Sequence, residues 1–328
     1  MTAITKYPQS LEKLPKKIIN HYQWADYIEL LCLVNIDGEY SQSDFLSRVQ
    51  DRADVLHEIE EDDTDDSLPP EEQDDKWNTR AFEYFAHLEF RLREFGEFYP
   101  FEFSSPTSIK LKDSLEEKHK FYLFFLFAAN LRYCLEYKAD LTGSFELISR
   151  DALKQMMPRN AEVHVFGKGS GVDSPYIGTK WNKIKRLSDD LKAVLHVNED
   201  NFTNNDTGDR GLDIVGYIPS PDKATGLLSV FGQCACSPDQ WVTKQLSSSW
   251  DSWSSVFYMC PPPINMAFIP LCFRNIAGDW NDKTSIHNSL LIDRLRFVRL
   301  LQDHFTAFSE SSSYLVVNEL IQLKEKLI

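Results

Sequence analysis

Two apolar segments separated by a run of turn-forming residues constrain the fold of this 328-residue chain more than any other feature. The segments are GLDIVGYI (211–218) and LLSVFGQCA (227–235), and PSPDKATG (219–226) lies between them. Pro, Asp and Gly favour tight turns, and each apolar segment has the length of a strand. The pattern therefore predicts an antiparallel hairpin.

The turn also predicts the register of the hairpin. If the turn is centred near Lys223, residue i faces residue 446 − i, and Asp213 faces Gln233 at the open end of the hairpin. An acid within an apolar strand is costly to bury unless it meets a cation or a metal ion. This polar pair is therefore a candidate functional site. The structural alternative is that Asp213 pairs with Lys or Arg and that Gln233 satisfies backbone groups at the strand end.

A basic amphipathic helix is predicted before the hairpin. Over residues 180–195 the apolar residues form one stripe at helical spacing, and Lys180, Lys183 and Arg186 lie mostly off that stripe. These three cations are candidate DNA-binding residues, with a solvated helix face as the alternative interpretation.

A helix is also predicted after the hairpin. Ser237 suits an N-cap and Pro238 suits the first helical position, so we expect a helix from 238 to about 248 that carries Lys244. The spacing of apolar residues predicts three further elements: a strand over 266–273 and helices over 288–308 and 314–327.

The first 155 residues have a different character. Apolar residues, many of them aromatic, recur at helical spacing over 10–57, 76–98 and 113–138, and Ser41 and Asp44 form a capping-box pattern. From about residue 156, Gly, Pro, Asn and Ser divide the chain into shorter pieces. We therefore expect an all-helical domain over 1–155, followed by a domain that contains the sheet.

Negative charge is concentrated in one tract. The chain has 35 basic and 50 acidic residues, a net charge of −15, and 11 of the acids lie between Glu58 and Asp75, where there is no Lys or Arg. The other 310 residues carry only −4, so the composition does not exclude nucleic-acid binding. Because its like charges repel, the tract 58–75 is predicted to be a solvated loop.

The chain lacks the patterns of membrane and secreted proteins. Asn130 and Arg132 interrupt the apolar stretch 121–135, which is shorter than the roughly 18 to 20 uninterrupted residues of a membrane span. The first residues show no apolar core followed by a cleavage site. We therefore expect a cytoplasmic protein without a membrane partner, whose six cysteines are thiols.

The two hairpin segments resemble motifs of the PD-(D/E)xK nuclease superfamily, most closely its Mrr-like restriction-endonuclease branch. GDRGLDIVG (208–216) is similar to the G-D-x-G-x-D block of that branch, and FGQCA (231–235) is similar to its Q-x-K strand. The resemblance covers about 156–275. It implies an α/β (α+β) fold with a restriction-endonuclease-like mixed sheet flanked by helices, in a domain that we expect over 156–310. A C-terminal helix is expected over 311–328.

The resemblance implies a DNA endonuclease that depends on Mg²⁺ or Mn²⁺. Carried over by position, Asp213 and Gln233 would hold the metal ion, and a lysine would orient or activate the attacking water. The lysine of the family falls on Ala235 in this sequence, so Lys244 is the candidate in its place. Asp209, in the same block, is expected to serve the turn.

The acid that this family often places on its first helix is not evident, and Asp190 and Glu199 are the candidates. Because Mrr-like nucleases often serve restriction or antiviral defence, the resemblance implies a bacterial defence role. The helical domain would regulate the nuclease or bind a protein partner, such as an ATPase or helicase subunit of a defence system. A homo-oligomer is the other assembly that we consider.

Two other functions stay open at this point. Ala235 at the lysine position would suit a degraded nuclease fold that acts as an interaction subunit, with the acidic tract as a DNA mimic. Cys234 and Cys236 would suit a zinc enzyme, but Cys-x-Cys lacks the second pair of a closed zinc site, and buried thiols are the alternative.

Overall fold

The computed structural model describes residues 6–51, 70–167, 174–203, 206–222 and 224–325. The chain forms two compact units, of which unit 1 comprises 1–138, 271–281 and 312–328 and unit 2 comprises 139–270 and 282–311. Unit 2 contains the hairpin, and the predicted boundary after residue 155 falls within it.

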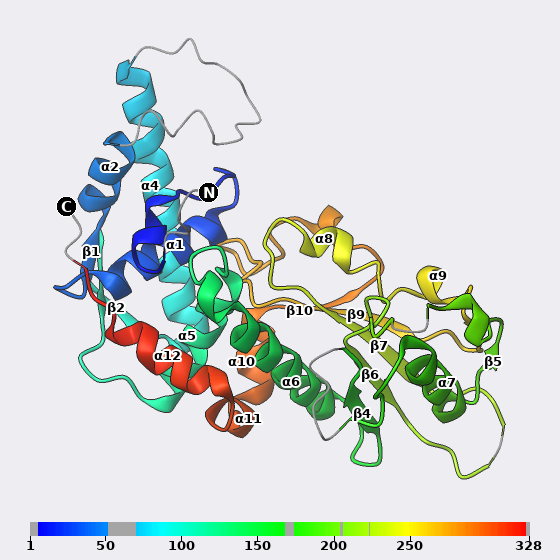
Figure 1. Ribbon diagram of the computed structural model, residues 1–328. Helices are drawn as coiled ribbons and strands as arrows, with labels where there is room; N and C mark the ends of the chain where they lie inside the picture. The colour runs from blue at the N-terminus through cyan, green and yellow to red at the C-terminus, as the bar shows by residue number, and fades with distance from the viewer. Residues whose placement is uncertain (1–5, 52–69, 168–173, 204–205, 223, 326–328) are drawn as a thin grey trace. The chain divides into compact units, whose positions relative to one another are not determined.

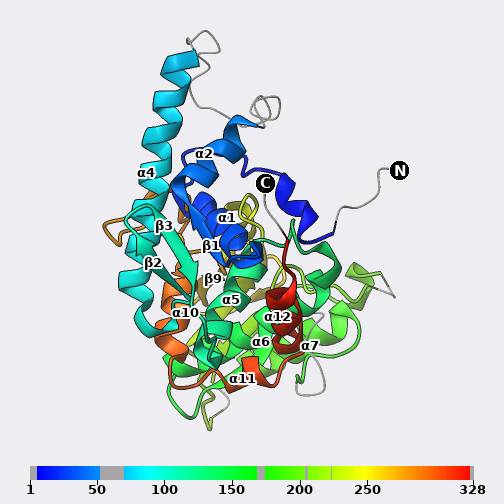
Figure 2. The ribbon, with the colours of Figure 1, turned by 90° about the vertical axis from the view of Figure 1, so that its left-hand side faces the viewer.

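Unit 1 combines helices with a small antiparallel sheet (Figure 2). Its helices are α1 (His21–Val34), α2 (Gln42–Gln50), α4 (Pro70–Phe95), α5 (Glu117–Ala129) and α12 (Ser312–Gln322). Its strands, in sheet order, are β1 (Glu39–Ser41), β3 (Ser108–Leu111) and β2 (Phe101–Ser105). The predicted capping box of Ser41 and Asp44 is confirmed at the start of α2.

The prediction of an all-helical N-terminal domain is wrong because of this sheet. Its strands have only three to five residues, which is too short for an alternating pattern to stand out in the sequence. The predicted loop 58–75 is also wrong at its end, since α4 begins at Pro70. Residues 58–69 lie outside the described part of the chain.

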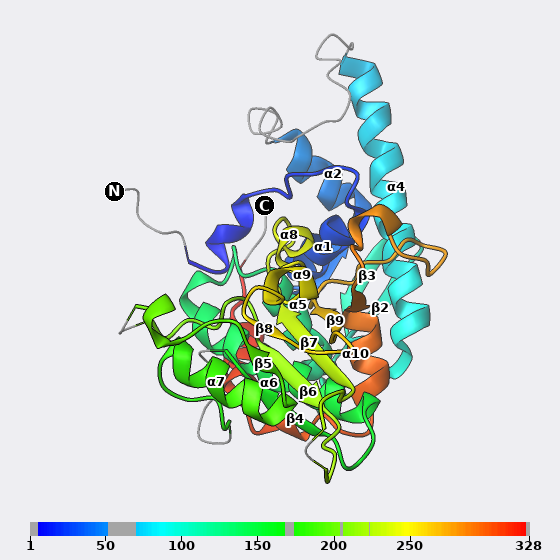
Figure 3. The same cartoon turned by 90° about the vertical axis from the view of Figure 1, so that its right-hand side faces the viewer.

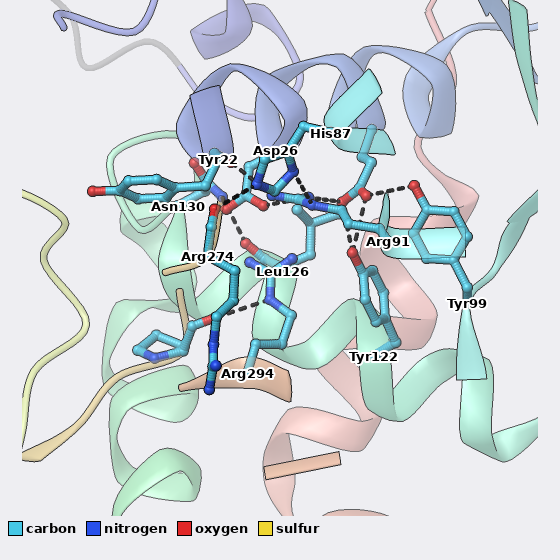
Figure 4. A network of polar contacts seen from close by, with 12 residues as sticks. Tyr22, Asp26, His87, Arg91, Tyr99, Tyr122, Leu126, Asn130, Arg274 and Arg294 are labelled. Carbon is cyan, nitrogen blue, oxygen red and sulfur yellow. Dashed lines mark hydrogen bonds and ion pairs between the residues drawn. The ribbon is translucent and has the colours of Figure 1, made fainter. Parts of the chain in front are cut away.

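A buried network of charged and polar side chains connects α1, α4 and α5 (Figure 4). Arg91 Nη1 lies 2.7 Å from Asp26 Oδ1 and 2.8 Å from Glu29 Oε2, and all three side chains are buried. The hydroxyl groups of Tyr99 and Tyr122 donate hydrogen bonds to Glu29 Oε1 at 2.8 and 2.9 Å. These contacts compensate carboxylates that would be very costly to bury alone, so they determine how the helices pack.

The most apolar predicted stretch, 121–135, is mostly in α5. This helix has 13 residues, and its Phe side chains are buried in the core of unit 1. Within the described residues, none of the helices combines the length and the apolar character that crossing a bilayer requires.

Unit 2 is a mixed α+β unit, as predicted (Figures 1 and 3). In sheet order, its five-stranded sheet is β10 (Leu290–Ile292), β9 (Ile264–Phe268), β7 (Ser229–Cys234), β6 (Ile214–Tyr217) and β4 (Glu162–Val165). β4, β6 and β7 are antiparallel to one another in turn, whereas β7, β9 and β10 are parallel. Its α-helices and remaining strands are α6 (Lys138–Met156), α7 (Lys180–Leu191), α8 (Trp241–Lys244), α9 (Trp250–Trp253), α10 (Arg294–Leu301), α11 (Thr306–Ser309), β5 (Val194–Leu195) and β8 (Phe257–Tyr258).

The predicted hairpin and its register are confirmed. β6 and β7 pair antiparallel, with Ile214 opposite Gly232 and Tyr217 opposite Ser229, as the 446 − i rule requires. The N–H of Asp213 donates to the carbonyl of Gly232 at 2.9 Å and continues the ladder by one residue. Asp213 therefore reaches the end of the hairpin that Gln233 also reaches.

Helices cover both faces of the hairpin. Gly216 on β6 admits α6, because a Cβ at this position would lie 2.7 Å from Met157 Sδ and 3.0 Å from Leu153 Cδ2. Val215 points to the opposite face, where it shares a core with the apolar stripe of α7. The close approach of α6 matters for the site, because Glu146 lies two helical turns before Leu153 on the same side of the helix.

Three predicted helices differ from the observed elements. The helix predicted over 180–195 ends at Leu191, because Lys192 takes a left-handed conformation with a φ of 55°. The helix predicted from 238 begins only at Trp241, after a turn that contains Pro238. The helix predicted over 288–308 is divided into β10, α10 and α11, because Leu290–Ile292 pairs with β9 and the Asp293 side chain then caps α10.

Candidate active site

The polar pair predicted from the hairpin register is in contact. Gln233 Nε2 donates a hydrogen bond to Asp213 Oδ2, and the N–H of Cys234 donates to the same oxygen at 2.6 Å. Asp213 is only 6% exposed and Gln233 only 7%. Among the described residues, the hydrogen-bond partners of the carboxylate are therefore amide groups, not the Lys or Arg side chain of the structural alternative.

The surroundings of Asp213 hold its pKa near neutrality. Together they raise the pKa to about 7. Burial has the largest effect and raises it; the charge of Asp209 also raises it, whereas the N–H of Cys234, the charge of Lys244 and the hydrogen bond of Gln233 lower it. A carboxyl group with this pKa gains or loses its proton easily near neutral pH. Such a perturbation is typical of functional sites.

Three carboxylates converge on one point beside Gly167, which follows β4. A Cβ at Gly167 would lie 3.3 Å from Asp213 Oδ1, 3.4 Å from Glu146 Oε2 and 3.7 Å from Asp209 Oδ2. The absence of a side chain at Gly167 keeps this point open. Because like charges repel, a cluster of this kind is stabilised by protons or by a cation.

Glu146 is the site residue that the sequence reasoning missed. It lies on α6, within the range that was predicted to belong to the helical domain. The available signal was its seven-residue spacing from Leu153, which places both residues on one helix face. That signal does not say what the face packs against, so it could not connect Glu146 with Asp213.

Asp209 shapes the turn that leads into β6, as predicted. Its Oδ1 accepts a hydrogen bond from the N–H of Gly211 at 2.8 Å. Gly211 has a φ of 72°, and a Cβ there would lie 2.4 Å from the Cβ of Ser247 and 3.2 Å from Gln233 Oε1. Only glycine fits this position without a shift of the backbone.

The amide oxygen of Gln233, Oε1, is a buried hydrogen-bond acceptor that lacks a donor among the described residues. A buried acceptor without a donor is costly, so it calls for an explanation such as a bound ion or water. This oxygen could serve as a ligand for a cation at the cluster.

Lys244, the last residue of α8, influences the site through its charge. Its side chain is exposed, and its positive charge is among the influences that lower the pKa of Asp213. One turn later, Ser247 lies against Gly211, so the segment after α8 borders the site. Ala235, at the position of the family's lysine, is buried.

The structure does not bring the other candidate acids to this cluster. Asp190 on α7 accepts hydrogen bonds from the hydroxyl of Tyr176 at 3.1 Å and from Arg186 Nε at 3.0 Å. Glu199 begins a short 3-10 helix, Glu199–Asn201, and its side chain is exposed. Neither acid contacts Asp213 in the described part of the chain.

The cations of α7 are largely engaged by nearby groups of unit 2. Lys180 Nζ lies 2.5 Å from Asp206 Oδ2, and Arg186 pairs with Asp190. Lys183 is only 4% exposed and donates to a backbone carbonyl at 3.1 Å. The expected DNA-binding surface on this helix is therefore reduced, because Lys183 points inward.

The oxygen donors suit a hard divalent cation. Carboxylate and amide oxygens, here from Glu146, Asp213 and Gln233, are ligands that Mg²⁺ prefers, and Mg²⁺ usually takes one or two carboxylates together with several waters. Among the described residues, no group of three or more His, Cys, Asp or Glu is arranged to hold a metal ion. A Mg²⁺ site needs only one or two carboxylates, because waters complete its coordination. The two carboxylates and the amide oxygen therefore suit Mg²⁺ better than a metal ion whose ligands all come from the protein.

Cys234 and Cys236 do not favour the zinc alternative. Both are free thiols, and Cys236 is buried. Burial raises the pKa of the Cys234 thiol well above its usual value, and the charges of Asp213 and Glu146 raise it further. Because zinc binds the thiolate, this environment opposes a soft-metal site.

Comparison of the chain with protein-family models, with curated proteins and with solved structures found no match.

Proposed function

We propose that unit 2 is a nuclease that hydrolyses DNA phosphodiester bonds with Mg²⁺ or Mn²⁺. The observation that carries the proposal is the convergence of Glu146, Asp209 and Asp213 on the open point at Gly167. It is supported by Gln233, whose amide donates to Asp213 and whose buried amide oxygen has no partner among the described residues. The mixed sheet, with α6 preceding β4 along the chain, supports a restriction-endonuclease-like fold.

Glu146, Asp213 and Gln233 would hold the cation. When bound, the cation would neutralise charge on the phosphate oxygens and lower the pKa of a bound water. Asp213 must give up the proton that its burial favours, and the charge of Lys244 assists that loss.

Lys244 would orient the attacking water and stabilise the charge that develops on the phosphate. In the hydrolysis, the water oxygen would bond to phosphorus as one phosphorus–ester oxygen bond breaks. A proton of the water would pass to solvent, and the leaving ester oxygen would take a proton from solvent to become a hydroxyl group. A protonated lysine donates hydrogen bonds and accepts none, so its contribution is orientation and electrostatic stabilisation.

The test is cleavage of supercoiled plasmid DNA by the purified chain in Mg²⁺ or Mn²⁺. We expect nicked and linear products that disappear on chelation with EDTA and in the Asp213→Ala and Lys244→Ala variants. Glu162→Gln is the control, because Glu162 is an exposed acid at the far end of β4 from Gly167. Cleavage that persists in Asp213→Ala would contradict the assignment of the metal site.

A second candidate is an interaction subunit with a degraded site. The hydrogen bonds that Asp213 Oδ2 accepts from Gln233 Nε2 and from the N–H of Cys234 favour it, because they satisfy this carboxylate oxygen without a cation. Calorimetric titration with Mn²⁺ separates the two candidates. The nuclease should bind the ion at a site that is lost in Asp213→Ala, whereas the interaction subunit should bind none.

A further inference from the structure

We propose that Arg210 binds a phosphate group of the DNA strand that enters this site, an inference that rests on the proposed nuclease function. Arg210 lies between Asp209 and Gly211, in the turn that leads into β6, and its side chain is exposed. Its neighbours on both sides are site residues, since Asp209 is one of the converging acids and Gly211 lies against Gln233 Oε1.

The backbone at Arg210 is unusual for an arginine. Its φ of 57° lies in the left-handed region, which glycine and asparagine adopt more readily. An exposed side chain contributes little packing in return for this strain. Strained residues of this kind concentrate at functional sites. We therefore attribute the arginine at this position to a function of its guanidinium group.

The side chain is anchored in a way that leaves donors available. Arg210 Nη2 donates to the carbonyl of Ser252, within α9, at 3.1 Å and to Ser255 Oγ, two residues after α9, at 3.3 Å. In the described part of the chain, one nitrogen therefore makes both hydrogen bonds. A guanidinium has five N–H groups, so the N–H of Nε and both N–H groups of Nη1 stay available to donate to phosphate oxygens.

The positive charge of Arg210 also offsets the negative charge of the site. Three carboxylates at the Gly167 point repel a phosphodiester anion, and Lys180 and Arg186 on α7 already pair with acids. Among the described residues, Arg210 hydrogen-bonds neutral groups and forms no ion pair with a carboxylate. Its positive charge therefore stays available to attract DNA to this end of the sheet.

The test is binding of a fluorescently labelled DNA duplex, measured by anisotropy in EDTA so that neither cleavage nor the metal ion contributes. Arg210→Asn removes the charge and suits the left-handed backbone, so the fold should be kept. We expect its affinity to fall about tenfold and the slope of log affinity against log salt to decrease in magnitude by about 1. Arg210→Lys should keep most of the slope.

The matched control is Arg159→Asn, an identical substitution at an exposed turn position that precedes β4, at the end of the strand remote from Gly167. It should leave affinity and slope unchanged. The inference is overturned if wild type does not bind the duplex, or if Arg210→Asn binds it as wild type does. If DNA binding depends on Arg210 but the protein does not cleave DNA in Mg²⁺, the phosphate contact is supported and the nuclease function is contradicted. If the wild type cleaves DNA but the Arg210→Asn substitution does not change DNA affinity, the nuclease function is supported and the phosphate contact is contradicted.

Discussion

Asp213 and Gln233 face each other at the end of the β6–β7 ladder, and the amide of Gln233 donates its hydrogen to the carboxylate of Asp213. Both side chains are buried, and the amide oxygen of Gln233 is left without a partner among the described residues. The contact places an acid with a pKa of about 7 next to an acceptor that lacks a donor. A Cβ at Gly167 would lie 3.3 Å from Asp213 Oδ1, so a cation at this point would compensate the carboxylate.

The raised pKa of Asp213 predicts a pH-dependent stability. Folding raises this pKa from 3.8 to about 7, so the favourable contribution is fully present below pH 3.8 and is lost as the pH rises through 7. The loss is on the order of 4 kcal/mol. In EDTA, we expect the unfolding free energy of wild type, measured with urea, to fall between about pH 4.5 and 8 relative to that of Asp213→Asn. Parallel pH profiles would contradict the raised pKa.

Glu146→Gln should impair metal binding while the fold is kept. The amide has nearly the same shape as the carboxylate but lacks its charge, so we expect Mn²⁺ affinity and plasmid cleavage to fall by about 100-fold. Calorimetry and gel assays measure the two effects. Glu162→Gln, which removes an exposed acid, should change neither. Unchanged Mn²⁺ affinity in Glu146→Gln would remove Glu146 from the site.

Gly167→Ala should close the point on which the acids converge. The added methyl group would lie 3.3 Å from Asp213 Oδ1 and 3.4 Å from Glu146 Oε2, closer than an ion and its waters can accommodate. We expect Mn²⁺ affinity to fall by about tenfold or more. Gly143→Ala is the control, because a Cβ on Gly143 in α6 would have no neighbour within 4 Å. Tight Mn²⁺ binding by Gly167→Ala would place the ion elsewhere.

Arg91→Met should destabilise unit 1. The substitution leaves the buried carboxylates of Asp26 and Glu29 without the guanidinium that bridges them, which costs about 3–5 kcal/mol in comparable cases. We expect a large decrease in the Tm measured by circular dichroism. Arg93→Met on the same helix removes a largely exposed arginine and should shift the Tm little. Equal Tm values for the two variants would show that the network contributes little to stability.

The central pair of the site could be predicted because the signals that define it are local. Turn residues and apolar segments specify the register of the β6–β7 hairpin, and a slip by one residue would turn the apolar side chains to the wrong face. Asp213 and Gln233 therefore followed from the sequence, as did the capping box at Ser41. The short strands of unit 1 and the division of 288–308 carried no comparable local signal.

The rest of the site depends on surfaces that meet only in the folded chain. The close packing of α6 on Gly216 brings Glu146 to the acids, and the turn at Gly211 brings Ser247 against it. Helical spacing shows which residues share a face, but not that the ammonium group of Lys183 turns inward to a carbonyl. The sequence by itself determined the hairpin, its register and the polar pair, because these depend on neighbouring residues. The tertiary structure decided which acids and cations join that pair, because their positions depend on how segments distant in the sequence pack together.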